Sequence, residues 1–93
     1  MFASKPVVIT LPFPTLDLGT HEAVIELLST VDPTGSTVID FSEVTFCDSL
    51  GLRAVIDVYA RHREAGGTLR VRSLGSQPSE LLAVTGLDAH LVE

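Results

Sequence analysis

Three short strand-like runs, separated by helix-like segments, place the strongest constraint on how this chain can fold. Residues 7–11, 36–41 and 68–72 are rich in the β-branched and apolar residues that favour strands. In the third run, apolar residues alternate with Arg70 and Arg72, which predicts one buried and one exposed face. Strands separated by helices are joined by right-handed crossovers and lie parallel. The pattern predicts an α/β fold with a largely parallel sheet and helices mainly on one face.

The segments between these runs carry helical periodicity. Residues 20–29 and 77–85 are predicted to form short helices, and residues 49–64 the longest helix. Pro12 and Pro14 at one end and Gly19 at the other make residues 13–19 a predicted loop. A last short strand is expected within residues 87–92, which gives a sheet of about four strands.

The longest predicted helix has an apolar and a charged face. Its core face is expected to consist of Leu52, Val55, Ile56 and Tyr59. On the opposite face, Arg53 with Asp57 and Asp57 with Arg61 have the i,i+4 spacing of helix ion pairs. That face is predicted to be solvated, and Gly66 and Gly67 are predicted to end the helix in a left-handed cap.

Length and composition narrow the classes of protein. The 93 residues predict a single domain spanning residues 1–93, and a 45% hydrophobic share is enough for a core. A single cysteine, Cys47, excludes an internal disulfide framework and favours a cytoplasmic chain. No apolar run is long enough to insert in a membrane. The net charge of −6 argues against a nucleic-acid partner and favours a protein partner.

The junction at residues 44–52 is the main candidate site. Asp48 and Ser49 stand at a predicted helix start, where backbone N–H groups without partners favour negative charge. A phosphate fits such a position, and phosphorylation of Ser49 would add about two negative charges. Asp and Ser are also the commonest helix caps, so a purely structural role stays open. Because loops gather at the carboxyl edge of parallel strands, Asp17 is expected near Ser49.

These segments together resemble the STAS domains, which are shared by sulfate transporters and anti-sigma factor antagonists. The family pattern is a strand, then a short loop ending in an aromatic and an apolar residue, then Asp-Ser-(Ser/Thr)-Gly-Leu opening a helix. Residues 38–41 and 44–52 are similar to this central signature. Residues 66–71 resemble the next strand and residues 82–87 the late helix, while Leu16-Asp17 matches an acidic loop position.

The resemblance implies a bacterial anti-sigma factor antagonist. Such a protein binds an anti-sigma factor that is also a serine kinase, and binding frees the sigma factor. The kinase phosphorylates the antagonist, which then dissociates, and a metal-dependent serine phosphatase resets it. By position, Ser49 is the phosphoacceptor, and Asp17, Asp48, Leu50 and Gly51 belong to the partner-binding surface. The resemblance makes the antagonist a substrate and not an enzyme.

Several positions depart from the family pattern. Leu50 stands where a second hydroxyl is usual, Thr15 where an acidic residue often precedes Leu-Asp, and Cys47 where Met or Leu is commoner. The family usually has a further N-terminal strand, so residues 1–5 either form a remnant of it or leave an edge uncovered. Leu50 keeps an alternative open: a STAS subunit that is not phosphorylated, in a signalling assembly or a lipid-transport ATPase complex.

Other chemistry has weaker support. Residues 47–51 lack the Gly-x-Ser-x-Gly of a hydrolase, and His62 is expected about 20 Å along the helix from Ser49. His21, His62 and His90 lack metal-ligand spacing, so surface or cap roles are expected, with no metal or cofactor. Cys47 is predicted to be buried, although a helix start nearby could lower its thiol pKa and permit a redox role.

Overall fold

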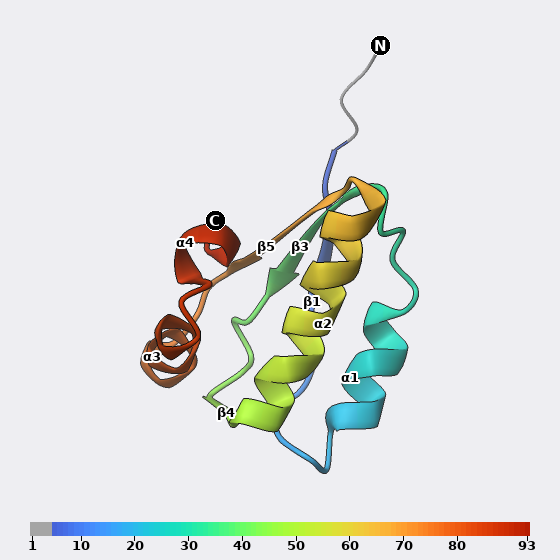
Figure 1. Cartoon of the computed structure of the whole chain (residues 1–93). Coiled ribbons are helices and arrows are strands. Elements are labelled where there is room, and N and C mark those ends of the chain that lie inside the picture. The colour runs from blue at the N-terminus through green and yellow to red at the C-terminus, as the bar shows by residue number, and fades with distance from the viewer. Residues whose placement is uncertain (1–4) are drawn as a thin grey trace.

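The computed structural model describes residues 5–93, and its main sheet has three parallel strands (Figure 1). The strands are β1 (Val7–Thr10), β3 (Ser36–Asp40) and β5 (Thr68–Arg72), in the order β1-β3-β5. Hydrogen bonds continue just beyond the paired residues, since Leu11 N–H donates to Asp40 O at 3.1 Å and Phe41 N–H to Arg72 O at 3.0 Å. The predicted parallel sheet is therefore confirmed.

Two further strands are only two residues long and pair with each other. They are β2 (Thr15–Leu16) and β4 (Phe46–Cys47), which lie parallel in a separate sheet. Pro14 O accepts from the backbone N–H of both Thr45 and Phe46, and Leu16 O accepts from Asp48 N–H at 2.9 Å. The prediction of a continuous loop over residues 13–19 is therefore wrong at β2, and the strand total is three plus two.

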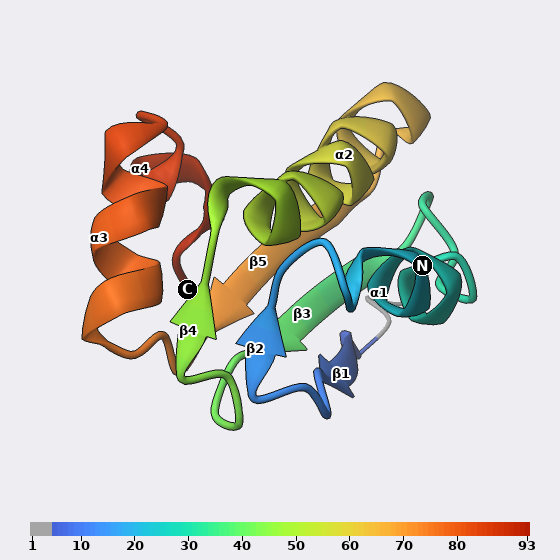
Figure 2. The same ribbon diagram turned by 90° about the horizontal axis from the view of Figure 1, so that it is seen from below.

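Helices cover one face of the main sheet, as predicted (Figures 1 and 2). The covering helices are α1 (His21–Leu28) and α2 (Ser49–Ala65), which pack against each other. To one side, α3 (Ser76–Val84) contacts β4 and α4 (Asp88–Leu91) contacts β5. Within residues 5–93, no helix is both long and apolar enough to cross a lipid bilayer.

The predicted last strand at residues 87–92 is wrong. Most of it forms α4, in which Leu91 N–H donates to Leu87 O at 2.9 Å. This turn places Leu91 in the core, fully buried. Only Val92 forms a β-bridge, with Val71, and Glu93 N–H donates to Val71 O at 2.9 Å. The alternatives for residues 1–5, a strand remnant or an uncovered edge, fall largely on residues 1–4, which lie outside the described residues.

The faces of α2 agree with the sequence pattern, except in their ion pairs. Leu52 and Val55 are buried, and Ile56 and Tyr59 are partly buried against the core. The charged face is exposed: Arg53, Asp57, Arg61 and Glu64. The expected i,i+4 ion pairs do not form. Within residues 5–93, the ion pair that is present joins Arg72 and Asp40. Gly66 ends α2 with φ 87°, the left-handed cap that was predicted.

His62 is buried, so the surface or cap role predicted for it is wrong. Its ring nitrogens are both hydrogen-bonded, Nε2 with the Thr37 hydroxyl at 2.9 Å and Nδ1 with Val58 O at 2.9 Å. With both nitrogens satisfied, an imidazole can pack in the core at little cost. This contact ties the C-terminal half of α2 to the central strand β3.

Candidate functional site

Ser49 is the first residue of α2 and is exposed to solvent. Asp48 precedes it as the N-cap, and its side chain accepts from Gly51 N–H at 2.8 Å. Asp48 O also accepts from Leu52 N–H at 3.0 Å. The cap therefore fixes the first turn of α2 without using the Ser49 side chain, which leaves the hydroxyl facing water.

Gly51 allows the start of α2 to lie directly against β2. A Cβ atom at this position would lie 2.2 Å from Leu16 O, closer than real Cβ atoms come to backbone. Only glycine fits such an approach without moving the helix or the strand. The close packing holds the Ser49 turn beside the loop that follows β2, as the argument from parallel strands predicted.

Asp17 begins that loop and has a structural role that the sequence analysis did not anticipate. Its Oδ1 accepts from Gly19 N–H at 2.9 Å and from Thr20 N–H at 3.2 Å. The Thr20 hydroxyl in turn accepts from Asp17 N–H at 3.0 Å. Asp17 thus orders the entry to α1, and any contact it makes with a partner is additional to this role.

Gln77 was not singled out from the sequence, yet it anchors α3 beside the site. Its Oε1 accepts from Cys47 N–H at 2.8 Å, and its Nε2 donates to Cys47 O at 2.7 Å. The side-chain amide therefore pairs with β4 as a neighbouring strand would. No local pattern marks such a residue, because its partner lies 30 positions away in the sequence.

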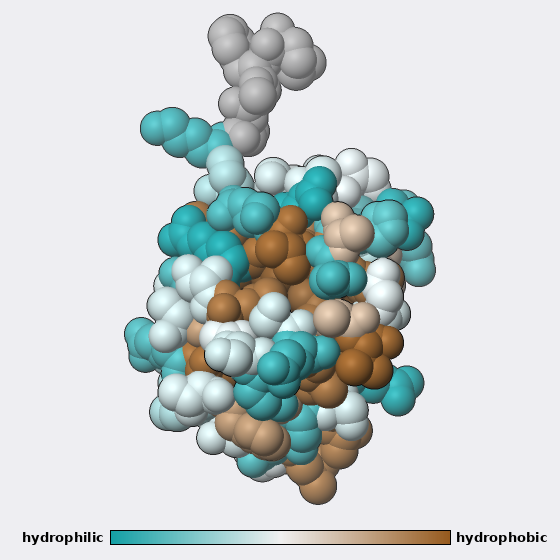
Figure 3. All heavy atoms as spheres, turned by 90° about the vertical axis from the view of Figure 1, so that its left-hand side faces the viewer, coloured by the Kyte–Doolittle hydropathy of each residue, from teal (hydrophilic) through white to brown (hydrophobic). Residues whose placement is uncertain are grey.

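Three large apolar side chains are exposed on the segments that lie beside the start of α2. Leu18 is 71% exposed, Phe46 47% and Leu50 42%. They come from the loop after β2, from β4 and from the first turn of α2. Figure 3 shows apolar side chains gathered at the lower end of the molecule, where Figure 1 places β4 and the start of α2. We call the surface formed by Leu18, Phe46, Ser49 and Leu50 the Ser49 edge.

Cys47 lies beneath this edge and is fully buried. Burial, with a smaller contribution from the charge of Asp48, raises the pKa of the Cys47 thiol to about 12. The thiol is therefore protonated at neutral pH, and the thiolate needed for redox chemistry is not formed. The suggestion that the helix start lowers this pKa is wrong, because loss of hydration outweighs it.

Hydrolytic or metal chemistry finds no support at this site. His62 lies far along α2 from Ser49, and its ring nitrogens are committed to Thr37 and Val58. In the described part of the chain, no three His, Cys, Asp or Glu side chains are grouped to hold a metal ion. Ser49 itself is exposed, and so are Leu18, Phe46 and Leu50.

Comparison with known proteins gives a family and several similar structures. A family model described as "Mlab, STAS domain" matches residues 15–93, whereas no curated protein matches the sequence. A candidate anti-sigma factor antagonist from Thermotoga maritima has a TM-score of 0.76 at 19% identity, over 95% of this chain and 80% of that one.

Two further solved structures have the same fold. An anti-sigma-factor antagonist (STAS) domain protein from Planctomyces limnophilus has a TM-score of 0.72 at 22% identity, over 91% of this chain and 77% of that one. A sulfate transporter family protein from Wolinella succinogenes has a TM-score of 0.72 at 15% identity, over 91% and 70%. At these identities the likeness establishes the fold, and it extends to both regulators and transporters.

Proposed function

This chain belongs to the STAS domain family, and we propose that it is an anti-sigma factor antagonist that binds an anti-sigma serine kinase. The observation that carries the proposal is the Ser49 edge, where an exposed serine and three exposed apolar side chains lie on neighbouring segments. Exposed apolar side chains gathered in one place are typical of a protein-binding surface. The antagonist proteins of similar fold make a regulatory partner the natural candidate.

Phosphorylation of Ser49 is the proposed off-switch. A phosphate there lies at the first turn of α2, where the backbone N–H groups favour an anion, so the domain need not refold. In a complex, however, the dianion would be enclosed with Leu18, Phe46 and Leu50 and would lose its hydration. Burying an unpaired charge is costly, so phosphorylation disfavours the complex while the fold persists.

In this proposal the chain is the substrate of its kinase and performs no catalysis itself. A serine phosphatase returns it to the binding-competent state, and the cycle regulates transcription in the bacterial cytoplasm by partner switching. Asp48 and Gly51 contribute by shaping the turn that presents Ser49. Asp17 adds its negative charge at the neighbouring loop.

Incubation with the cognate kinase and ATP, followed by mass spectrometry, tests the proposal. We expect one phosphate per chain, located on Ser49, and none on the Ser49→Ala variant. Ser49→Ala should stay bound to the kinase when ATP is present, while the wild type dissociates. An unmodified Ser49 in a stable complex with the kinase would reject the switch.

The second candidate is a fixed STAS subunit of a signalling assembly or a lipid-transport ATPase complex. Leu50 favours it, because an exposed apolar side chain next to Ser49 suits a permanent interface better than a phosphorylation site. Neighbouring genes separate the two: a sigma factor and a kinase for the switch, or transporter subunits for the fixed subunit. In the fixed complex, Ser49→Ala should change neither binding nor its response to ATP.

A further inference from the structure

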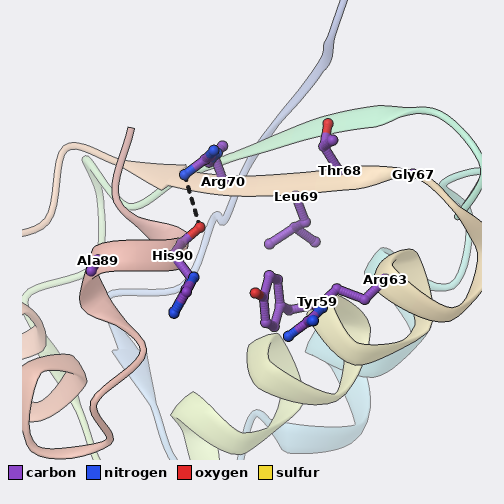
Figure 4. Close-up of a pocket in the computed structure, with 8 residues that line it drawn as sticks. All are labelled: Tyr59, Arg63, Gly67, Thr68, Leu69, Arg70, Ala89 and His90. Atoms are coloured by element: carbon purple, nitrogen blue, oxygen red, sulfur yellow. Dashed lines mark hydrogen bonds between the residues drawn. The ribbon is translucent and has the colours of Figure 1, made fainter.

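The two edges of the main sheet are finished differently. At β5, Val92 forms a bridge with Val71, and Glu93 N–H donates to Val71 O at 2.9 Å. Arg70 Nη1 also donates to His90 O at 2.9 Å, which holds α4 beside this edge (Figure 4). At the opposite edge, β1 pairs with β3 alone among the elements of residues 5–93 (Figure 2). An edge of this kind presents backbone N–H and C=O groups to which another strand can add.

The hydrogen bonds to β3 show which backbone groups of β1 face outward. Leu11 N–H donates to Asp40 O at 3.1 Å, so Leu11 directs its backbone groups towards β3. Successive residues of a strand in a parallel ladder direct their N–H and C=O groups to opposite sides. Ile9 therefore also faces β3, whereas Val8 and Thr10 direct their N–H and C=O groups away from the sheet.

The side chains of β1 are apolar and incompletely buried. Val7 is 53% exposed and Val8 43%, and Ile9 is only partly buried against the core. Residues 6–12 include no charged side chain, although the chain has a net charge of −6. Charged side chains are a common protection of edge strands against pairing, and this edge has none. Two copies of an acidic chain repel each other, so an uncharged strip is where they can meet at least cost.

We propose that β1 pairs in antiparallel fashion with β1 of a second copy of this chain, with Ile9 at the centre of the pair. In this register Val8 of each copy lies opposite Thr10 of the other, so the outward N–H and C=O groups of both residues are hydrogen-bonded. Residues 6–12 read Pro-Val-Val-Ile-Thr-Leu-Pro, which is nearly symmetric about Ile9. Proline lies opposite proline at both ends, and the ladder stops there because neither has an N–H.

This register also keeps the two faces of the sheet in place. Opposite residues are both even-numbered or both odd-numbered, so the side of the sheet that carries α1 and α2 in one copy continues into the same side of the other. The result is one continuous sheet with β5 at both outer edges. Because each copy uses the same strand, the contact closes on itself and gives a dimer and not a filament.

Cross-linking of single-cysteine variants tests the register. In the proposed pair the two Ile9 Cα atoms are about 4.5 Å apart, within reach of a disulfide, whereas the two Val8 residues are diagonal neighbours about 7–8 Å apart. With oxidised glutathione, Ile9→Cys should form a covalent dimer at least tenfold faster than Val8→Cys, measured on non-reducing gels. The native Cys47 is fully buried and should not react. Random collision would favour the more exposed Val8→Cys, so equal rates or the reverse order would overturn the register.

Sedimentation equilibrium of the full chain tests the dimer itself. The wild type should pass from monomer to dimer as its concentration rises, and Val8→Lys should weaken this association at least tenfold, because two lysines then become diagonal neighbours across the pair. The matched control is Val84→Lys, which makes the same change at an exposed valine of α3 and should stay within twofold of wild type. A wild type that is monomeric up to about 1 mM, or equal weakening in both variants, would overturn the proposal.

Discussion

The two ends of α2 show how one helix can present two unlike surfaces. At its start, the Ser49 edge is apolar and carries an exposed hydroxyl. Towards its end, Arg63 of α2 is exposed and lines an open cavity, while His62 is buried in the core. At the start of α2, Gly51 lets the helix pack directly against the backbone of Leu16. Near the end, His62 holds the helix through side-chain hydrogen bonds. The residues that hold both ends of α2 are buried, so the exposed residues at each end are not needed to hold the helix.

The largest effect is expected when a buried side chain near the start of α2 is shortened. Leu52 is buried and its neighbour Arg53 is exposed. Leu52→Ala should lower the free energy of unfolding by about 2–5 kcal/mol, because it leaves a cavity in the core. Arg53→Ala should cost under about 0.5 kcal/mol. Equal losses in urea titrations of the two variants would show that the faces of α2 are assigned wrongly.

Near the other end of α2, the buried His62 holds the helix by a hydrogen bond, and losing this bond should cost less stability. His62→Leu leaves the buried Thr37 hydroxyl without its partner, which should cost about 1–3 kcal/mol of unfolding free energy. Adding Thr37→Val should recover part of the loss, since both polar groups are then gone. Urea denaturation of the two single variants and the double variant measures the coupling. Additive losses would mean that the hydrogen bond does not hold this end of the helix.

Variants of Asp17 can show whether this residue contributes to the stability of the fold, to partner binding, or to both. Asp17→Ala should cost about 1 kcal/mol, because the acceptor for Gly19 and Thr20 N–H is lost. Asp17→Asn keeps an acceptor oxygen and removes the charge, so it should lose less stability. Weaker kinase binding by Asp17→Asn, in a calorimetric titration, would assign the charge to recognition. Unchanged binding would leave Asp17 with its structural role alone.

Cys47 gives a smaller, pH-dependent effect. Its folded pKa is raised from 9.0 to about 12, so between these values the unfolded state binds fewer protons than the folded state. Stability from this group is therefore intact below pH 9 and is lost as pH rises towards 12. The stability difference between wild type and Cys47→Ala should fall by about 1 kcal/mol from pH 8 to pH 10. A constant difference would mean that the thiol ionises normally.

The sequence predicted those parts of the fold that have a repeated local pattern. The strands β1, β3 and β5 and the helix α2 have alternation or helical periodicity, and the cap at Asp48 has a local signature. The two-residue strands β2 and β4 are too short to have a period, and their pairing depends on segments about 30 residues apart. Residues 88–91 were mistaken for a strand because a short apolar run fits either structure.

The candidate site could be predicted only in part, because only some of its residues have a local signal in the sequence. Ser49 and Asp48 stand out locally, whereas the exposure of Leu18 and Phe46 depends on how distant segments meet. The Gln77 contact with Cys47 has no signal in a single sequence. His62 could have been found, because it lies four positions after Val58 and seven after Val55 on the buried face of α2.

In the proposed function, the partner binds the start of α2, and negative charge there opposes binding. The most direct measurement compares the kinase affinity of two variants that add one carboxylate to opposite ends of the helix, Ser49→Asp and Ala65→Asp. Both positions are exposed, so both variants should fold. We expect Ser49→Asp to weaken binding at least tenfold and Ala65→Asp to leave it within twofold of wild type. Wild-type affinity in Ser49→Asp, or equal weakening in both variants, would show that the partner does not bind the start of α2 in this way.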